Sequence, residues 1–142
     1  MLEPFPTDWH TALLLVPHPD DPEYGCAAAV AKWTAQGQTV HYALACRGEV
    51  GIAGMPPEQA GPLREAEQRR SGAIVGVEEL QFWDFSDSQI RNTPQLRAKI
   101  AETINSILMT RLSDRSNAHA PNTITLDCDI ILRGSTRRYP SS

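Results

Sequence analysis

The chain has 142 residues, of which 41% are apolar and 21% charged, with a net charge of −4 and a pI near 5.5. This length allows one domain with a modest core. An acidic chain lacks the basic face that nucleic acid or an anionic membrane would require, so neither is expected as a partner. We expect neither membrane insertion nor a signal peptide, because no apolar run reaches the length of a membrane span and the N-terminus lacks a basic segment followed by an apolar core. Three cysteines without CxxC spacing predict reduced thiols and a cytoplasmic location.

The first predicted elements are a strand and a helix with a polar turn between them. An apolar run over residues 11–16, followed by proline, is typical of a buried strand. Small apolar residues at helical spacing predict a helix over 24–36, with Gly37 as its C′ residue. The intervening segment 17–25 carries a His and two Asp at the carboxyl end of the strand. In open α/β sheets, ligands bind at that end.

The side chains of this turn suit metal-assisted hydrolysis. His18 and Asp21 are three residues apart, so a turn can bring both onto one Zn²⁺ or another divalent metal. Asp20 and Asp21 are adjacent and cannot easily face the same point. One can bind metal while the other stays free as a base, which is the division that hydrolysis by a metal-bound water requires. The alternative is that both Asp residues only cap the following helix.

Two further elements and a long loop follow the first helix. Residues 39–45 predict a second strand, and an irregular run over 47–62 that is rich in Gly and Pro predicts a long loop at its carboxyl end. A charged helix is expected over 63–75, ending at Gly76, with most of its charges on a solvated face. Arg64 lies in the predicted first turn, where a cation is unfavourable, so we expect it to have a partner.

Several charged residues are predicted at the same edge of the sheet as the first turn. A third strand is expected over 80–85, and Asp84 and Asp87 fall at its carboxyl end. Asp84 could bind a sugar hydroxyl, or either Asp could simply shape the turn. Arg47 and Glu49 lie at the base of the long loop, where a surface salt bridge is the simplest interpretation.

The C-terminal third begins with a helix that Thr93 caps and Pro94 opens. A fourth strand is expected over 123–132. Alternating strands and helices predict an α/β fold, a Rossmann-like parallel sheet with helices on both faces. The first strand is not followed by Gly-x-Gly-x-x-Gly, so a dinucleotide site is rejected. We expect one domain over 1–132 and a basic, Ser-rich, disordered tail over 133–142.

The segment 17–26, Pro-His-Pro-Asp-Asp-Pro-Glu-Tyr-Gly-Cys, resembles the signature of the LmbE-like, or PIG-L, deacetylases. This family includes N-acetylglucosaminyl-phosphatidylinositol de-N-acetylases and the deacetylases of mycothiol and bacillithiol pathways. The resemblance continues through 47–51, 64–67 and 83–87, and it covers about residues 10–110.

The resemblance implies a zinc-type N-deacetylase that acts on a small molecule containing N-acetylglucosamine. It implies that His18 and Asp21 hold the metal and that Asp20 activates water. The residues that it implies for substrate binding or the wall of the site are Glu49, Arg64 and Asp84. Self-association into a homo-oligomer is left open.

The end of the chain departs from the family pattern. Family members carry a second motif, roughly His-Pro-Asp-His, after the fourth strand, and no His follows Leu132 here. The family members are also longer, so we expect a truncated, frame-shifted or diverged C-terminus. His10 and His41 are expected at the amino edge, which leaves His119 as the only late candidate for a third ligand. The alternative function is therefore an inactive fragment or a module that binds metal or sugar weakly.

Overall fold

The structure, a computed structural model, describes residues 8–113, with side chains described as far as residue 110. The predicted strand over 123–132, His119 and the predicted tail lie outside the described residues. The elements in chain order are β1 (Thr11–Val16), α1 (Asp21–Gly25), α2 (Ala27–Ala35), β2 (Thr39–Leu44), α3 (Pro57–Ile74), β3 (Leu80–Phe82) and α4 (Pro94–Ser113).

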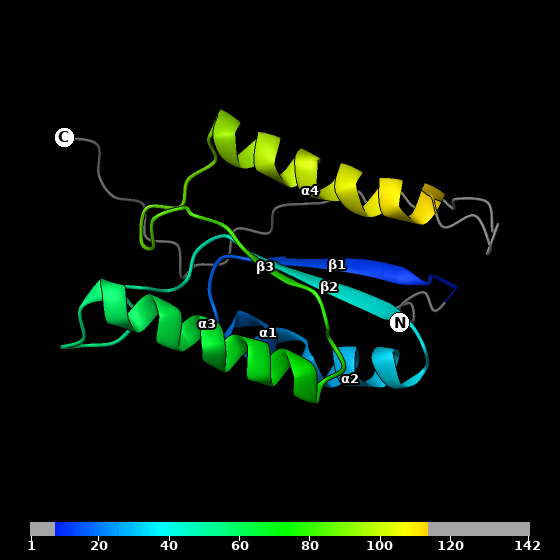
Figure 1. The fold of residues 1–142 in the computed structure, drawn as a ribbon, viewed down its shortest axis with the longest axis horizontal. Helices are drawn as coiled ribbons and strands as arrows, with labels where there is room; N and C mark the ends of the chain where they lie inside the picture. Colours follow the sequence, from blue (N-terminus) through cyan, green and yellow to red (C-terminus); the bar gives the residue numbers. More distant parts are fainter. Residues whose placement is uncertain (1–7, 114–142) are drawn as a thin grey trace, which may run out of the picture.

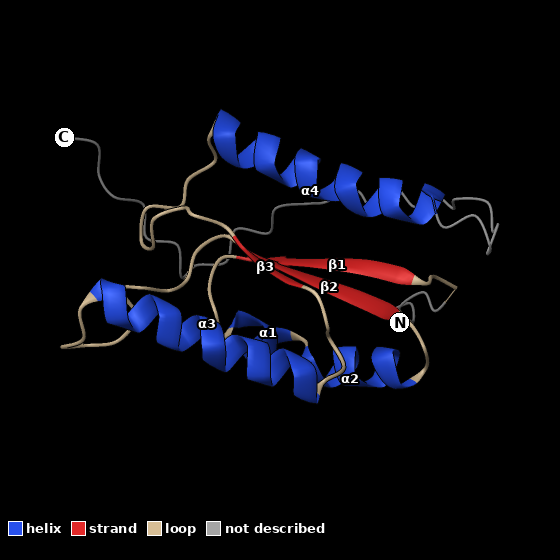
Figure 2. Cartoon of the chain, in the orientation of Figure 1, coloured by secondary structure: helices blue, strands red, loops and turns tan. Residues whose placement is uncertain are grey.

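The three strands form one parallel sheet in the order β1-β2-β3. Thr11 pairs with Thr39 at one end of the first ladder and Val16 with Leu44 at the other. Helices α1, α2 and α3 cover one face of the sheet, and α4 lies over the opposite face (Figures 1 and 2). The predicted α/β fold, with a parallel sheet and helices on both faces, is confirmed. None of the described helices is long and apolar enough to cross a membrane.

The central strand β2 divides the core into two parts because its side chains alternate between the faces. Tyr42 and Leu44 are fully buried on the face that packs against α2. Ala43 and Ala45 point to the other face, where they pack with buried Trp83 and one side of α4. Burial on both faces is usual for the middle of a parallel sheet. This packing holds the carboxyl ends of all three strands at one edge.

Two predicted boundaries are wrong. The helix expected over 24–36 is two helices, because Cys26 leaves helical geometry with φ −148°. The loop expected over 47–62 ends early, because Pro57 begins α3 instead of breaking structure; proline fits the first helical position, which needs no N–H donor. Gly37, with φ +87°, follows α2 as predicted.

The other helix and strand predictions agree more closely with the structure. The first strand has the predicted bounds, the second ends one residue early, and the third is shorter, Leu80–Phe82. Thr93 caps α4 as predicted, since its Oγ1 accepts the Leu96 N–H at 3.2 Å. Gly76 follows α3 with φ +78°. Apart from the division of one helix at Cys26, the errors therefore concern ends of elements and not their order.

Candidate functional site

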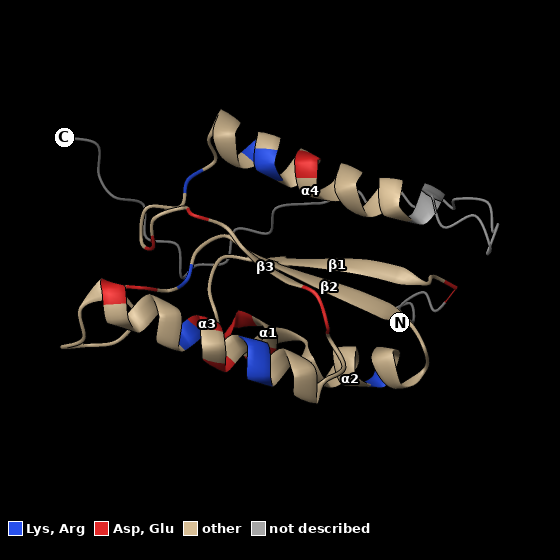
Figure 3. Cartoon of the chain, viewed as in Figure 1, with Lys and Arg blue, Asp and Glu red and all other residues tan. Residues whose placement is uncertain are grey.

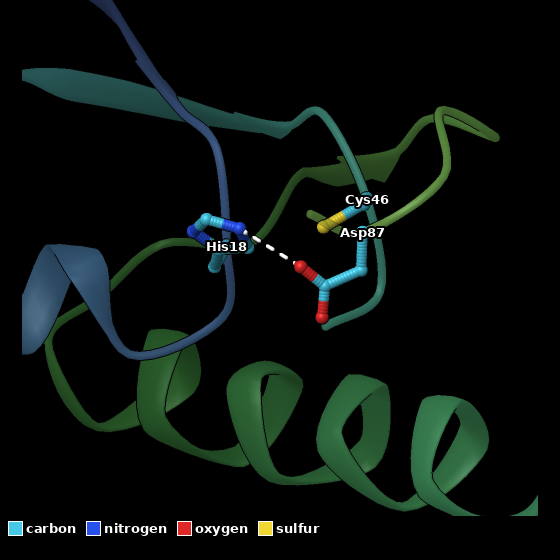
Figure 4. A group of neighbouring side chains, drawn as sticks. All are labelled: His18, Cys46 and Asp87. Carbon is cyan, nitrogen blue, oxygen red and sulfur yellow. Dashed lines mark ion pairs between the residues drawn. The ribbon is translucent and has the colours of Figure 1, made fainter. Parts of the chain in front are cut away.

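The candidate site lies where the loops after β1, β2 and β3 meet at the carboxyl edge of the sheet. These loops stay joined beyond the strands, since the Cys46 N–H donates to Pro17 O at 3.1 Å and the Phe85 N–H to Ala45 O at 3.2 Å. Side chains from all three loops come together there: His18, Cys46 and Asp87 each offer a ligand atom within 4.8 Å of the others (Figure 4). The predicted convergence on this edge is confirmed for His18.

The His18 imidazole lies between two carboxylates. Its Nδ1 is 3.5 Å from Asp21 Oδ2. Its Nε2 is 3.1 Å from Asp87 Oδ1, the ion pair that Figure 4 marks with a dashed line. The two sides differ in solvent access, because the Asp21 side chain is 37% exposed and that of Asp87 only 8%. The backbone N–H of His18 also donates to Asp21 Oδ2, at 2.8 Å, and this hydrogen bond fixes the turn. A metal ion could therefore approach from the open Asp21 side or from the buried Asp87 side.

The buried Asp87 carboxylate is fully engaged by the surrounding loops. It accepts the Val50 N–H at 3.1 Å and the Ser88 N–H at 2.7 Å, in addition to facing His18. Its own N–H donates to Glu49 Oε1 at 2.8 Å. Sequence reasoning placed Asp87 on this edge but selected Asp84 instead. Only the turn after β3 shows which of the two Asp residues faces His18.

Cys46 is close to His18 but is poorly suited to bind a metal. Burial raises the pKa of its thiol to about 11, so a metal binding there would have to displace a proton that the buried surroundings favour. A metal ligand must be a thiolate. The sulfur is also engaged by backbone: it lies 3.3 Å from Pro17 O, to which the thiol donates, and accepts the Gly48 N–H at 3.3 Å. Its complete burial agrees with the predicted role as a small core residue.

Asp20 has a strained backbone, with φ +86° and ψ −26°. Positive φ is uncommon for residues other than Gly, although Asn, Asp and His adopt it more often than the rest, and such strain gathers at functional sites. Within the described chain, the Asp20 carboxylate caps no N–H of α1. It instead accepts a hydrogen bond from Arg64 at 2.8 Å. Because Asp21 contacts His18, neither Asp is explained by helix capping alone.

Arg64 ties the loop after β1 to the loop after β2. Its guanidinium donates to Pro19 O at 2.8 Å, to Gly48 O at 2.9 Å and to Asp20 Oδ2. The prediction that it has a partner is confirmed, although the reason was wrong, because α3 begins at Pro57 and Arg64 lies about two turns inside it. Its side chain is only 13% exposed.

A second ion-pair group lies at the rim of the site. Arg47 bonds to Glu65 at 3.0 Å and pairs with Asp84 (Figure 3 marks the charged residues). Hydrogen bonds to Asp84 and Glu65 raise the pKa of Arg47. Arg47 therefore forms a salt bridge, but with Glu65 and Asp84, whereas Glu49 accepts the Asp87 N–H. Arg47, Glu49 and Asp84 also line a pocket of about 300 Å³ together with Trp83.

The two early histidines lie away from this edge, as predicted. His10 precedes β1, and His41 Nδ1 pairs with Glu79 Oε2 at 2.8 Å, just before β3 begins. Neither is placed to bind the same metal as His18. These two histidines therefore do not supply the third metal ligand that the sequence left open.

The open side offers two of the three protein ligands that a catalytic zinc needs, and their spacing suits a divalent metal. Two ligands of a tetrahedral zinc lie about 3.4 Å apart when the bonds are about 2.0–2.1 Å. His18 Nδ1 and Asp21 Oδ2, 3.5 Å apart, are close to that spacing. This side is exposed enough to admit water and substrate, which a catalytic metal needs. The carboxylates on both sides accept backbone N–H groups, Asp21 from His18 and Asp87 from Val50 and Ser88, but Asp87 is the more deeply buried of the two.

The protein is thus an α/β domain with a parallel sheet, and its candidate site consists of a His and several carboxylates at the carboxyl edge of that sheet. Comparison with known proteins defines the family: residues 13–122 match the model "PIG-L: GlcNAc-PI de-N-acetylase". The chain belongs to the PIG-L family, as its resemblance predicted.

The chain is similar to two curated proteins and to a solved structure. It is 32% identical over 104 residues to the diacetylchitobiose deacetylase of Thermococcus kodakarensis, covering 72% of this chain and 39% of that protein. It is 31% identical over 99 residues to a probable N-acetyl-alpha-D-glucosaminyl L-malate deacetylase 2 of Bacillus anthracis, covering 65% and 44%. The N,N'-diacetylchitobiose deacetylase of Pyrococcus horikoshii shares the fold, with a TM-score of 0.63, 22% identity and coverage of 66% and 36%. The chain thus spans about two fifths of the length of these curated relatives.

Proposed function

We propose that the protein is a metal-dependent hydrolase that removes the N-acetyl group from a small molecule containing N-acetylglucosamine. The observation that carries the proposal is the turn after β1, where His18 and Asp21 form an open pair of donors beside the strained Asp20. Membership of the PIG-L family and two relatives named as deacetylases support this reaction class. They also favour a hydrolase over the alternative, a module that only binds metal or sugar.

His18 and Asp21 would hold Zn²⁺ or another divalent metal. When bound, such an ion makes a water molecule acidic and polarises a carbonyl group. Asp20 is the proposed base, because its carboxylate caps no N–H of α1. The carboxylate of the neighbouring Asp21 instead accepts the His18 backbone N–H. Carboxylates commonly serve as the general base in hydrolysis by a metal-bound water.

Asp87 and Glu49 support the metal ligand from behind. Asp87 Oδ1 lies 3.1 Å from His18 Nε2 and would accept a proton held on that nitrogen, which would leave Nδ1 free to face the metal beside Asp21. Carboxylate partners of this kind commonly fix the tautomer of a metal-binding His. Glu49 in turn accepts the Asp87 N–H, so the predicted wall residue acts through Asp87.

The amino-sugar substrate is proposed to lie along the rim of the site. Asp84 is 85% exposed and lines the pocket of about 300 Å³, where it could accept a sugar hydroxyl. The predicted contact of Arg64 with substrate would use a guanidinium that already holds three oxygens.

A cytoplasmic location is supported by Cys26 and Cys46, the two cysteines of the described region, which are free.

The experiment that tests the proposal compares Asp20→Asn with Asp21→Asn. Zinc content is measured by plasma mass spectrometry, and acetate release from N,N'-diacetylchitobiose by proton NMR at high protein concentration. We expect Asp20→Asn to keep zinc and lose acetate release, and Asp21→Asn to lose zinc. The reverse pattern would mean that the two roles are exchanged. A zinc-loaded wild-type chain that releases no acetate would support the binding module instead.

A further inference from the structure

We infer that Gln68 is a positioning residue that fixes the backbone of Asp20 and thereby the direction of the proposed base. The inference rests on the proposed function of Asp20. Gln68 lies in α3, 48 residues away in sequence, and its Oε1 accepts the Asp20 N–H at 2.8 Å. Gln68 is thus a partner, distant in sequence, of the residue with the strained backbone, Asp20.

Burial makes a polar role for Gln68 necessary. Its side chain is 3% exposed, and the other buried residues of α3 are small: Ala60, Gly61 and Gly72. An apolar side chain would fill this position at lower cost, because a buried amide is destabilising unless its donors and acceptor are satisfied. Packing alone therefore does not explain a Gln here.

The orientation of the Gln68 amide is set by a second contact. Its Nε2 donates to Glu23 Oε1 at 3.0 Å, and Ser71 Oγ donates to the same oxygen. Because the NH₂ end faces a carboxylate, the carbonyl end must face the Asp20 N–H. These three side chains and Asp20 line a pocket of about 220 Å³ between α1 and α3.

Arg64 and Gln68 hold different parts of Asp20 from one helix. They are four residues apart, so they lie on the same face of α3. Arg64 bonds the carboxylate at 2.8 Å, and Gln68 bonds the amide. Without the second bond, Asp20 would be free to relax toward negative φ, which an L-residue prefers. The carboxylate would then leave its position beside Asp21.

The test uses three variants of the full chain. Gln68→Leu removes both hydrogen bonds and keeps an apolar volume in the same place. Gln59→Leu, at an exposed position of the same helix, is the matched control. The double variant Gln68→Glu with Glu23→Gln exchanges donor and acceptor, so both hydrogen bonds can still form.

The readouts are amide hydrogen exchange and the intraresidue N–H to Hα NOE of Asp20, which is strong when φ is positive. In Gln68→Leu we expect exchange at Asp20 about tenfold faster than in wild type, the loss of one hydrogen bond, and a weaker NOE. Exchange at Tyr42, in the centre of the sheet, should change much less. The exchanged pair should restore both signals, and Gln59→Leu should leave them unchanged. If Gln68→Leu does not fold, the exchanged pair decides: a lost NOE there, with a folded sheet, contradicts the inference.

The activity readout is separate from these. Zinc affinity should stay the same in Gln68→Leu, while acetate release should fall on the order of 10- to 100-fold, the cost of a misplaced catalytic group. An Asp20 amide that keeps its protection and NOE in Gln68→Leu would overturn the inference, whatever the activity. Acetate release that persists in Asp20→Asn would instead overturn the proposed function, so the two failures are distinguishable.

Discussion

Replacing Asp87 with Ala is the most informative single perturbation of the site, because three loops depend on this carboxylate. The change removes the contact with His18 and the hydrogen bonds accepted from Val50 and Ser88. Each contributes about 1 kcal/mol net, since the donors lie near the surface and can rehydrate. We therefore expect the free energy of unfolding to fall by about 2–3 kcal/mol. Loss of the group that orients His18 should weaken zinc binding by about 10- to 100-fold.

The assays are urea denaturation, with the same slope expected for both proteins, and zinc titration by calorimetry. The matched control is Asp84→Ala, because Asp84 is 85% exposed and makes a surface ion pair with Arg47. That change should cost less than about 1 kcal/mol and leave zinc affinity unchanged. Equal losses at the two positions, or normal zinc binding in Asp87→Ala, would refute the role given to Asp87.

Three further predictions follow from the contacts around the site. Gly51→Ala should displace Arg64, because a Cβ at Gly51 would lie 2.1 Å from its Nη1; the Asp20 carboxylate would lose its partner, and acetate release should fall while zinc binding persists. Cys46 should resist alkylation at pH 8, because burial raises the pKa of its thiol to about 11; rapid labelling of the folded chain would contradict this. Burial of the Glu65 carboxyl raises its pKa, but the hydrogen bonds that it accepts from Arg69 and Arg47 outweigh this effect, so the pKa of Glu65 lies below its ordinary value. The stability that Glu65→Gln removes should thus be present above the ordinary Glu pKa of about 4.3 and vanish as pH falls below it, as measured by urea unfolding across pH.

Local patterns were sufficient to predict the sheet. The apolar run of β1 and the alternating pattern of β2 predicted the strand bounds within one residue. They did so because the positions that pack in the core must carry apolar side chains. Errors arose where Pro and Gly have more than one use. Pro57 opens a helix, and Pro62 lies within it, although a Pro there cannot donate its backbone hydrogen bond. Composition alone does not show which use applies.

The site was predicted only in part, for a related reason. His18 and Asp21 are near in sequence, so their contact follows from the local turn. Asp87 and Gln68 reach the same turn from distant elements, and their roles depend on which way each side chain points. The predicted functions of Glu49, Arg64 and Asp84 in substrate binding stay predictions.

The central claim is that the metal lies on the open side of His18 and not on the buried side beside Cys46. X-ray absorption spectroscopy of the chain loaded with one equivalent of Zn²⁺ tests this most directly, because sulfur and nitrogen or oxygen ligands give different bond lengths. We predict a shell of nitrogen and oxygen ligands alone, at about 2.0–2.2 Å. A sulfur ligand at about 2.3 Å would place the ion beside Cys46 and contradict the account.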